Sequence, residues 1–123
     1  KESIERYQIE VEKDKMAFEV MNFGKILSEY GITLEDLAAN SPVHKKTRLQ
    51  MMNLAFKISQ HPEMVEKIKR TKQLPIKDIC SILKSKKRQV GRWRKYIIAL
   101  VIVLTHKELY GFRTYIFSER GKE

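Results

Sequence analysis

Apolar residues recur at spacings of three and four along most of the chain, which is the period of an α-helix with one buried face. The first long helical pattern runs from about Ser3 to Tyr30, and Gly31 is placed to end it as a C-cap. Its expected apolar face consists of Ala17, Val20, Met21, Gly24 and Leu27. Alternating runs bounded by turn residues, which would indicate β-strands, are nearly absent. The pattern therefore predicts an all-α protein.

The segment after the first helix carries a strong helix-start signal. The Thr33 hydroxyl can accept a hydrogen bond from the backbone N–H of Asp36, and the Asp36 carboxylate can accept one from the backbone of Thr33. Ile32 and Leu37 are spaced to pack against each other across this start. The sequence therefore predicts a capping box at the beginning of a second helix.

Two prolines indicate the next helix boundaries. One interpretation of residues 41–44 has Ser41 capping a helix whose first residue is Pro42, and this helix then runs to about Gln60. A shorter helix is expected after Pro62, and it ends in a basic connector over residues 69–73.

The second half of the chain predicts a helix-turn-helix. Apolar residues fall at i, i+3, i+4 and i+7 on a short helix, namely Ile76, Ile79, Cys80 and Leu83. A break at residues 84–86 separates it from a long helix that runs from about Lys87 to Thr105. A last short helix is expected near residues 108–115. The prediction is a helical bundle of about six to seven helices that ends in a helix-turn-helix with a long recognition helix.

A chain of 123 residues is long enough to bury one apolar core, and no glycine- or proline-rich tract divides it. We expect a single domain with an N-terminal helical lobe and linker at residues 1–73, a helix-turn-helix lobe at 74–116 and a tail at 117–123.

The charge of the chain is strongly positive and localised. Lys and Arg outnumber Asp and Glu by 25 to 15, for a formal net charge of +10, which favours a polyanionic partner such as nucleic acid. No acidic residue lies between Asp78 and Glu108. The cationic residues of that span are Lys84, Lys86, Lys87, Arg88, Arg92, Arg94, Lys95 and Lys107.

On the predicted long helix the apolar and cationic positions fall on opposite sides. The apolar side consists of Val90, Ile97, Val101 and Leu104, and the opposite side has Ser85, Arg88, Arg92 and Lys95. In a helix-turn-helix the first turns of the second helix enter the major groove, where Arg can bind guanine and Gln can bind adenine with two hydrogen bonds each. The alternative is an ordinary solvated face on an antiparallel helix pair.

This pattern gives the predicted DNA-binding residues. The residues expected to reach base edges are Arg88, Gln89 and Arg92. The residues expected to bind phosphates are Lys86, Lys87 and Lys95. Trp93 is the remaining candidate, and packing between the recognition helix and the core is favoured over contact with DNA. Gly91 lowers helix propensity by roughly 1 kcal/mol relative to Ala, and a close approach to DNA or partner backbone is one possible reason for it.

Enzymatic and metal-binding sites are not predicted. His44, His61 and His106 are far apart in sequence and have no ligand-type neighbours at metal-binding spacing. The single cysteine, Cys80, excludes an internal disulfide and favours a reducing compartment. There is no glycine-rich phosphate loop and no nucleophile motif. We therefore expect a cytoplasmic protein that is not an enzyme and needs no cofactor.

No membrane span is predicted either. The longest uninterrupted apolar run, at residues 96–104, is about half of the ~20 residues needed to cross a bilayer. It lies within the predicted recognition helix, so we expect it to belong to the core.

Three segments of the chain resemble the C-terminal domain of SigI-type RNA polymerase sigma factors, and the resemblance extends over nearly the whole chain. They are Leu74-Pro75-Ile76-Lys77-Asp78-Ile79, Arg94-Lys95-Tyr96-Ile97-Ile98-Ala99-Leu100 and Ser41-Pro42-Val43-His44-Lys45-Lys46-Thr47-Arg48. The resemblance implies recognition of the minus-35 element of promoter DNA, together with a separate N-terminal domain that docks on the RNA polymerase core. It also implies inhibition by the cytosolic N-terminal domain of a membrane-anchored, RsgI-type anti-sigma factor, and a role in stress or polysaccharide responses.

A protein-interaction module is the main alternative function. Four aromatic residues are candidates for the rim of an apolar groove that binds a partner, although aromatic residues at these spacings are more often core. They are Tyr96, Tyr110, Phe112 and Tyr115. A helix-turn-helix regulator that binds DNA or RNA without polymerase is also compatible with the basic surface, although no exposed aromatic platform for RNA is evident.

Overall fold

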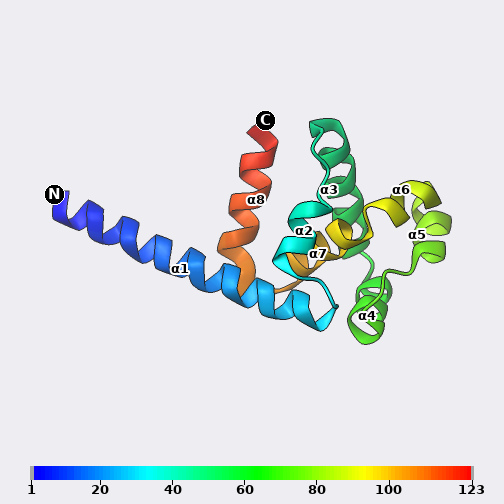
Figure 1. Ribbon diagram of the computed structural model, residues 1–123, viewed down its shortest axis with the longest axis horizontal. Coiled ribbons are helices and arrows are strands. Elements are labelled where there is room, and N and C mark those ends of the chain that lie inside the picture. The colour runs from blue at the N-terminus through cyan, green and yellow to red at the C-terminus, as the bar shows by residue number, and fades with distance from the viewer. Residues whose placement is uncertain (1, 123) are drawn as a thin grey trace.

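The computed structural model describes the backbone of residues 2–122 and the side chains of residues 5–117 except 7, 9 and 12. This part of the chain contains eight α-helices, one 3-10 helix and no strand, which confirms the all-α prediction (Figure 1). The elements are α1 (Glu2–Glu29), α2 (Leu34–Ala39), α3 (Lys45–Ser59), α4 (Pro62–Thr71), α5 (Ile76–Leu83), α6 (Lys87–Arg92), α7 (Arg94–Thr105), η1 (Lys107–Leu109) and α8 (Tyr110–Lys122).

Helix α1 is the longest element, and only its C-terminal half joins the core. Its first half extends away from the other helices in Figure 1. Phe23 and Leu27 are buried, whereas Ala17 and Met21, which the sequence placed on the apolar face, are exposed. The predicted apolar face was therefore wrong in part, because by the helical period Ala17 and Met21 point to other sides of α1 than the buried Phe23 and Leu27.

The junction between α1 and α2 follows the sequence prediction. Gly31 has a φ of 72°, in the left-handed region, and its N–H donates to the Ser28 carbonyl oxygen at 3.1 Å. The Thr33 hydroxyl accepts from the Asp36 backbone N–H at 2.9 Å, while the Asp36 carboxylate accepts from the Thr33 N–H at 3.2 Å. This confirms the C-cap and the capping box.

The predicted start of α3 was wrong. The helix begins at Lys45, with His44 as an N-cap that makes no side-chain capping bond. The Ser41 hydroxyl instead donates to the Leu37 carbonyl oxygen at 2.6 Å, and Pro42 is buried. Because Ser41 closes the end of α2, its oxygen is directed back toward α2 and does not cap the next helix.

The long helix predicted over residues 87–105 is divided at Trp93 into α6 and α7. Trp93 has φ −105° and ψ 24°, so its backbone leaves the helical region. Its N–H still donates to the Gln89 carbonyl oxygen at 3.1 Å, and its carbonyl oxygen accepts from the Ile97 N–H at 2.9 Å. One residue therefore ends α6 and begins α7.

Helix α7 is the central helix of the bundle. All eight residues from Tyr96 to Val103 are buried, so after its first turn this helix is apolar on every side. It packs against α3 and also contacts α1, α2 and α8. The cationic face predicted for the whole span 87–105 is therefore limited to α6 and the first turn of α7.

Buried side chains from α1 to η1 form a single cluster, with residues on both sides of position 74. The division into lobes at residues 1–73 and 74–116 stays a prediction. Helix α8 extends to Lys122, so most of the segment predicted as a tail at 117–123 is helical, and residue 123 lies outside the described residues. Within residues 2–122 no helix has the length and hydropathy that a membrane span requires.

Candidate nucleic-acid interface

Helices α5 and α6 and the turn between them form the predicted helix-turn-helix. Ile79 of α5 and Val90 of α6 are buried, at 0% and 1% exposure, and they fix the inner sides of both helices on the core. Ile76, Cys80 and Leu83 are partly buried against the same core, which confirms the predicted stripe. The turn is left-handed at Lys84, with a φ of 56°. Beyond this turn, Lys86 and Lys87 at the N-terminus of α6 are exposed.

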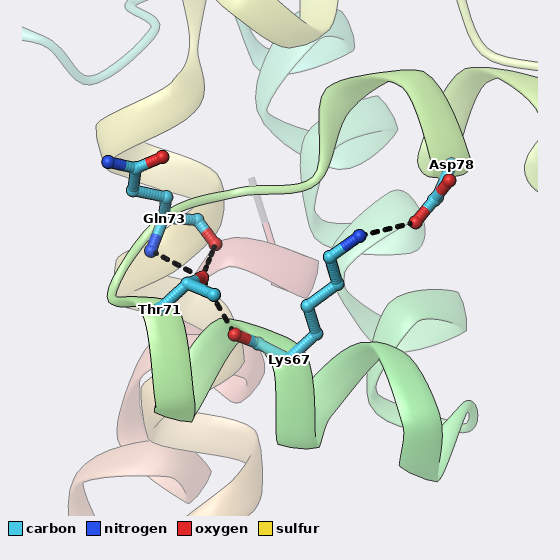
Figure 2. A network of polar contacts seen from close by, with 4 residues as sticks. All are labelled: Lys67, Thr71, Gln73 and Asp78. Atoms are coloured by element: carbon cyan, nitrogen blue, oxygen red, sulfur yellow. Dashed lines mark hydrogen bonds and ion pairs between the residues drawn. The ribbon is translucent and has the colours of Figure 1, made fainter.

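Helix α5, the first helix of the helix-turn-helix, is linked to α4 by a small polar network (Figure 2). The Lys67 ammonium on α4 lies 3.1 Å from the Asp78 carboxylate on α5. The Thr71 hydroxyl donates to the Lys67 carbonyl oxygen at 2.7 Å and accepts from the Gln73 N–H at 3.3 Å. The network links the last turn of α4 to the connector and to α5, so it positions the helix-turn-helix relative to the bundle.

Most of the predicted DNA-binding residues of α6 are exposed on one cationic surface. Lys86, Lys87, Arg88 and Arg92 are all solvent-exposed, and no acidic residue occurs in α6 or in its flanking turns. Lys86 is the N-cap residue, so its charge lies where the helix already has a partial positive end. We refer to the exposed side chains of residues 86–92 as the α6 surface.

Two predicted residues occupy constrained positions. The Trp93 indole is half-buried against the core, and the Arg92 guanidinium lies 4.6 Å from the centre of its ring. Gln89 is also half-buried, and its Nε2 donates to the Gln50 Oε1 on α3 at 3.2 Å. Trp93 therefore packs and supports Arg92, in line with the favoured interpretation, while Gln89 is tied to a neighbouring helix.

Lys95 lies apart from the α6 surface. It is half-buried in the first turn of α7, and its charge acts on Asp36 of the α2 capping box. The pKa of Asp36 is lowered, first by the hydrogen bond from the Thr33 backbone, then by the Thr33 hydroxyl, and then by the positive charge of Lys95. Thr33 and Lys95 therefore both favour the ionised form of the Asp36 carboxyl.

The sequence prediction missed polar residues of α3 that adjoin the helix-turn-helix. A cleft of about 380 Å³ separates α3 from the turn before α6, and α3 lines it with Gln50, Asn53 and Lys57. A signal for this site was present in the sequence, because no acidic residue occurs between Asp36 and Glu63.

Three of the four aromatic residues predicted to rim a partner-binding groove line one groove in the structure, and the fourth does not. An apolar groove of about 330 Å³ lies between α2 and α8, with α7 as its floor, and Tyr96, Phe112 and Tyr115 line it. Tyr96 is buried and belongs to the floor, whereas Tyr115 is 56% exposed. Tyr110 does not line the groove; it is 65% exposed and lies 5.1 Å from the Arg113 guanidinium.

The side chains that the structure describes contain no group of three His, Cys, Asp or Glu residues that could hold a metal ion. Cys80 is a free thiol, partly buried within the α5 stripe.

The fold and the surface define the class of protein: a helical protein with a helix-turn-helix whose second helix presents an exposed cationic side. No protein-family model matches the chain. It is 36% identical over 113 residues to the RNA polymerase sigma factor SigI3 of Acetivibrio thermocellus, which covers 90% of this chain and 45% of that protein. It is 32% identical over 108 residues to SigI of Bacillus subtilis, which covers 88% of this chain and 43% of the relative.

A third relative, SigI6 of Acetivibrio thermocellus, is 32% identical over 113 residues, with 92% of this chain and 44% of the relative covered. Over about 90% of its length the chain is therefore homologous to SigI-family RNA polymerase sigma factors, which is consistent with a C-terminal domain of that family, and the helix-turn-helix is compatible with this relationship. Sigma factors are not enzymes, so the family confirms that prediction. The chain spans less than half the length of these relatives.

Proposed function

We propose that this chain recognises the minus-35 element of promoter DNA, with the α6 surface in the major groove. The observation that carries the proposal is the exposed, acid-free cationic side of α6 on a helix-turn-helix in a sigma-factor family. Arg88 and Arg92 reach base edges, and Lys86 and Lys87 bind the flanking phosphates. Lys95, in the first turn of α7, binds a further phosphate.

The relationship to sigma factors also supports a role for this chain in transcription. The chain acts in the cytoplasm as part of a sigma factor that binds the RNA polymerase core and directs transcription initiation, and other parts of the polymerase complex add to its affinity for the promoter. The relatives of this chain are RNA polymerase sigma factors, which supports this role.

Substitutions on the α6 surface test the proposal. Arg92→Ala is expected to cost about 1–3 kcal/mol of binding and to relax base preference, whereas Lys87→Ala is expected to weaken binding to all duplexes alike. Binding is measured by fluorescence anisotropy at low ionic strength, with a minus-35 duplex and a scrambled duplex of the same composition. Equal losses by both variants on both duplexes would contradict the base-reading role of Arg92.

We further propose that the apolar groove binds the cytosolic N-terminal domain of an RsgI-type anti-sigma factor. The groove supports this second function because it combines an apolar floor with exposed apolar side chains at its edges, Leu34 at 45% and Tyr115 at 56% exposure. An inhibitor bound there and extending over the α6 surface would compete with DNA.

Two tyrosines of α8 provide a matched test of this groove. Tyr115→Ala is expected to weaken binding of the anti-sigma domain at least tenfold, because a large apolar side chain at an interface commonly contributes more than about 1.4 kcal/mol. Tyr110→Ala removes an equally exposed tyrosine outside the groove and is expected to change binding less than twofold. Equal effects of the two substitutions in calorimetric titration would exclude the groove as the binding site.

A further inference from the structure

One face of α3 forms an exposed polar stripe. Its four residues, Lys46, Gln50, Asn53 and Lys57, follow one another at steps of four, three and four, so they lie on the same side of the helix. All four are exposed, whereas the other side of α3 is buried in the core. We refer to these four residues as the α3 stripe.

The α3 stripe is continuous with the helix-turn-helix. Its residues Gln50, Asn53 and Lys57 line the same cleft as Lys84 and Lys86 of the turn. The hydrogen bond between Gln89 and Gln50 joins the stripe directly to α6. The α3 stripe and the α6 surface are therefore two edges of one cationic surface.

The net positive charge of the protein resides in the two segments that supply this surface and the central helix. Residues 37–62 and 79–107 contain 12 of the 25 Lys and Arg residues and none of the 15 acidic residues. The remainder of the chain has 13 basic and 15 acidic residues, so it is slightly negative. Because the fold packs α3 against α7 and brings both beside α6, two segments that are separate in sequence form one positive region.

We propose that the α3 stripe binds the phosphodiester backbone of duplex DNA beside the major groove that α6 enters. The inference rests on the proposed function of the α6 surface and extends it to a second helix. Lys46 and Lys57 supply ammonium groups for phosphate oxygens, and the Asn53 amide can donate a hydrogen bond between them. Charge complementarity selects this occupant, since the stripe is basic and faces the same cleft as the lysines that precede α6.

The salt dependence of binding tests the proposal. The double variant Lys46→Gln/Lys57→Gln removes two charges from the stripe, and Lys13→Gln/Lys25→Gln removes two from exposed positions on α1. Both are measured on a minus-35 duplex that extends about one helical turn beyond the site on each side. Each phosphate contact makes the negative slope of log K against log salt concentration steeper by about 0.9. The stripe variant is therefore expected to make the slope shallower by about 1.8. The α1 variant is expected to keep the wild-type slope, and equal slopes for the two variants would overturn the proposal.

Further variants and a second probe separate this inference from the function on which it rests. If Lys87→Ala lowers affinity and slope while the stripe variant does not, the stripe proposal is wrong and the proposed function stands. If the stripe variant lowers the slope and Lys87→Ala does not, the role of α6 is wrong. The variant Lys46→Arg/Lys57→Arg keeps both charges and is expected to keep the wild-type slope. A shallower slope for this variant would overturn the role of charge in the α3 stripe. An equally large effect of Lys46→Gln/Lys57→Gln on single-stranded RNA would overturn recognition of a duplex.

Discussion

The carboxamide of Gln89 on α6 donates a hydrogen bond to the carboxamide oxygen of Gln50 on α3, across 3.2 Å. The sequence alone suggested Gln89 as a free side chain able to bind adenine. In the structure its amide nitrogen has a partner on the neighbouring helix, and the side chain is half-buried. Helix α3 therefore restrains the orientation of the Gln89 side chain.

This hydrogen bond predicts coupling between the two glutamines in DNA binding. Gln89→Ala is expected to cost about 1–3 kcal/mol of discrimination at one base pair. Gln50→Ala is expected to alter the same discrimination by about 0.5–1.5 kcal/mol, the usual net contribution of a hydrogen bond. A double-mutant cycle on duplexes that differ at one position measures the coupling. Strict additivity would show that Gln50 does not act through Gln89.

The burial of two isoleucines on α5 predicts how much each side of this helix contributes to the free energy of unfolding. Ile79 is 0% exposed and Ile82 is 54% exposed, so the same substitution can be made on both sides of one helix. Ile79→Ala is expected to lower the free energy of unfolding by about 2–5 kcal/mol because it leaves a cavity. Ile82→Ala is expected to change it by no more than about 0.5 kcal/mol. Urea unfolding measures both, and similar losses would contradict the observed orientation of α5.

Local signals in the sequence predicted several features of the fold that depend on local interactions. The capping box at Thr33, the C-cap at Gly31 and the α5 stripe around Ile79 each involve residues within about one or two helical turns. These interactions are encoded by neighbouring residues, so their prediction does not require knowledge of the tertiary packing.

The division at Trp93 could not be predicted in the same way. No proline occurs in residues 87–105, and the hydrophobic period continues from Val90 to Ile97 as in an unbroken helix. The break instead accompanies the packing of α7 among α1, α2, α3 and α8, while α6 packs on α5. Gly91 lies two residues before the break, and a Cβ added there would meet nothing within 4 Å, so no contact within the protein requires the glycine.

The sequence likewise predicted only the part of the candidate site whose residues are neighbours in the chain. Residues 86–92 form a contiguous cationic segment, so this part of the site could be recognised from the sequence. The α3 stripe lies about 40 residues away, and Gln50 meets Gln89 only because both helices pack on the same core. The Lys95–Asp36 interaction was missed for the same reason, since its partners are also distant in sequence.

The ion pair between Lys67 and Asp78 predicts a small, salt-sensitive contribution to stability. Both side chains are about half-exposed, at 47% and 49%, so solvent screens their attraction. In a double-mutant cycle with Lys67→Gln and Asp78→Asn, we expect a coupling of about 0.2–1 kcal/mol in the free energy of unfolding. The coupling should disappear near 1 M salt. Coupling that persists at high salt would mean that the pair is more buried than the structure indicates.

The capping box predicts a pH dependence at acidic pH. Because the pKa of Asp36 in the folded protein is lowered from 3.8, its ionised form favours folding. This contribution is fully present above the unfolded pKa and is lost as the pH falls through the lower folded pKa. Thermal unfolding of wild type and Asp36→Asn should therefore differ most near neutral pH, and the difference should narrow below about pH 4. A difference that does not vary with pH would contradict a role for the carboxylate charge.

We propose that α6 and its flanking residues form the DNA-reading surface of this chain. Titration of the isotope-labelled chain with a minus-35 duplex, followed by amide chemical shifts at low ionic strength, tests it most directly. We predict that the largest shifts fall on residues 84–93, with smaller ones along α3, and that the exposed first half of α1 does not respond. Shifts that concentrate on α1 or α8 and leave residues 84–93 unchanged would contradict the account.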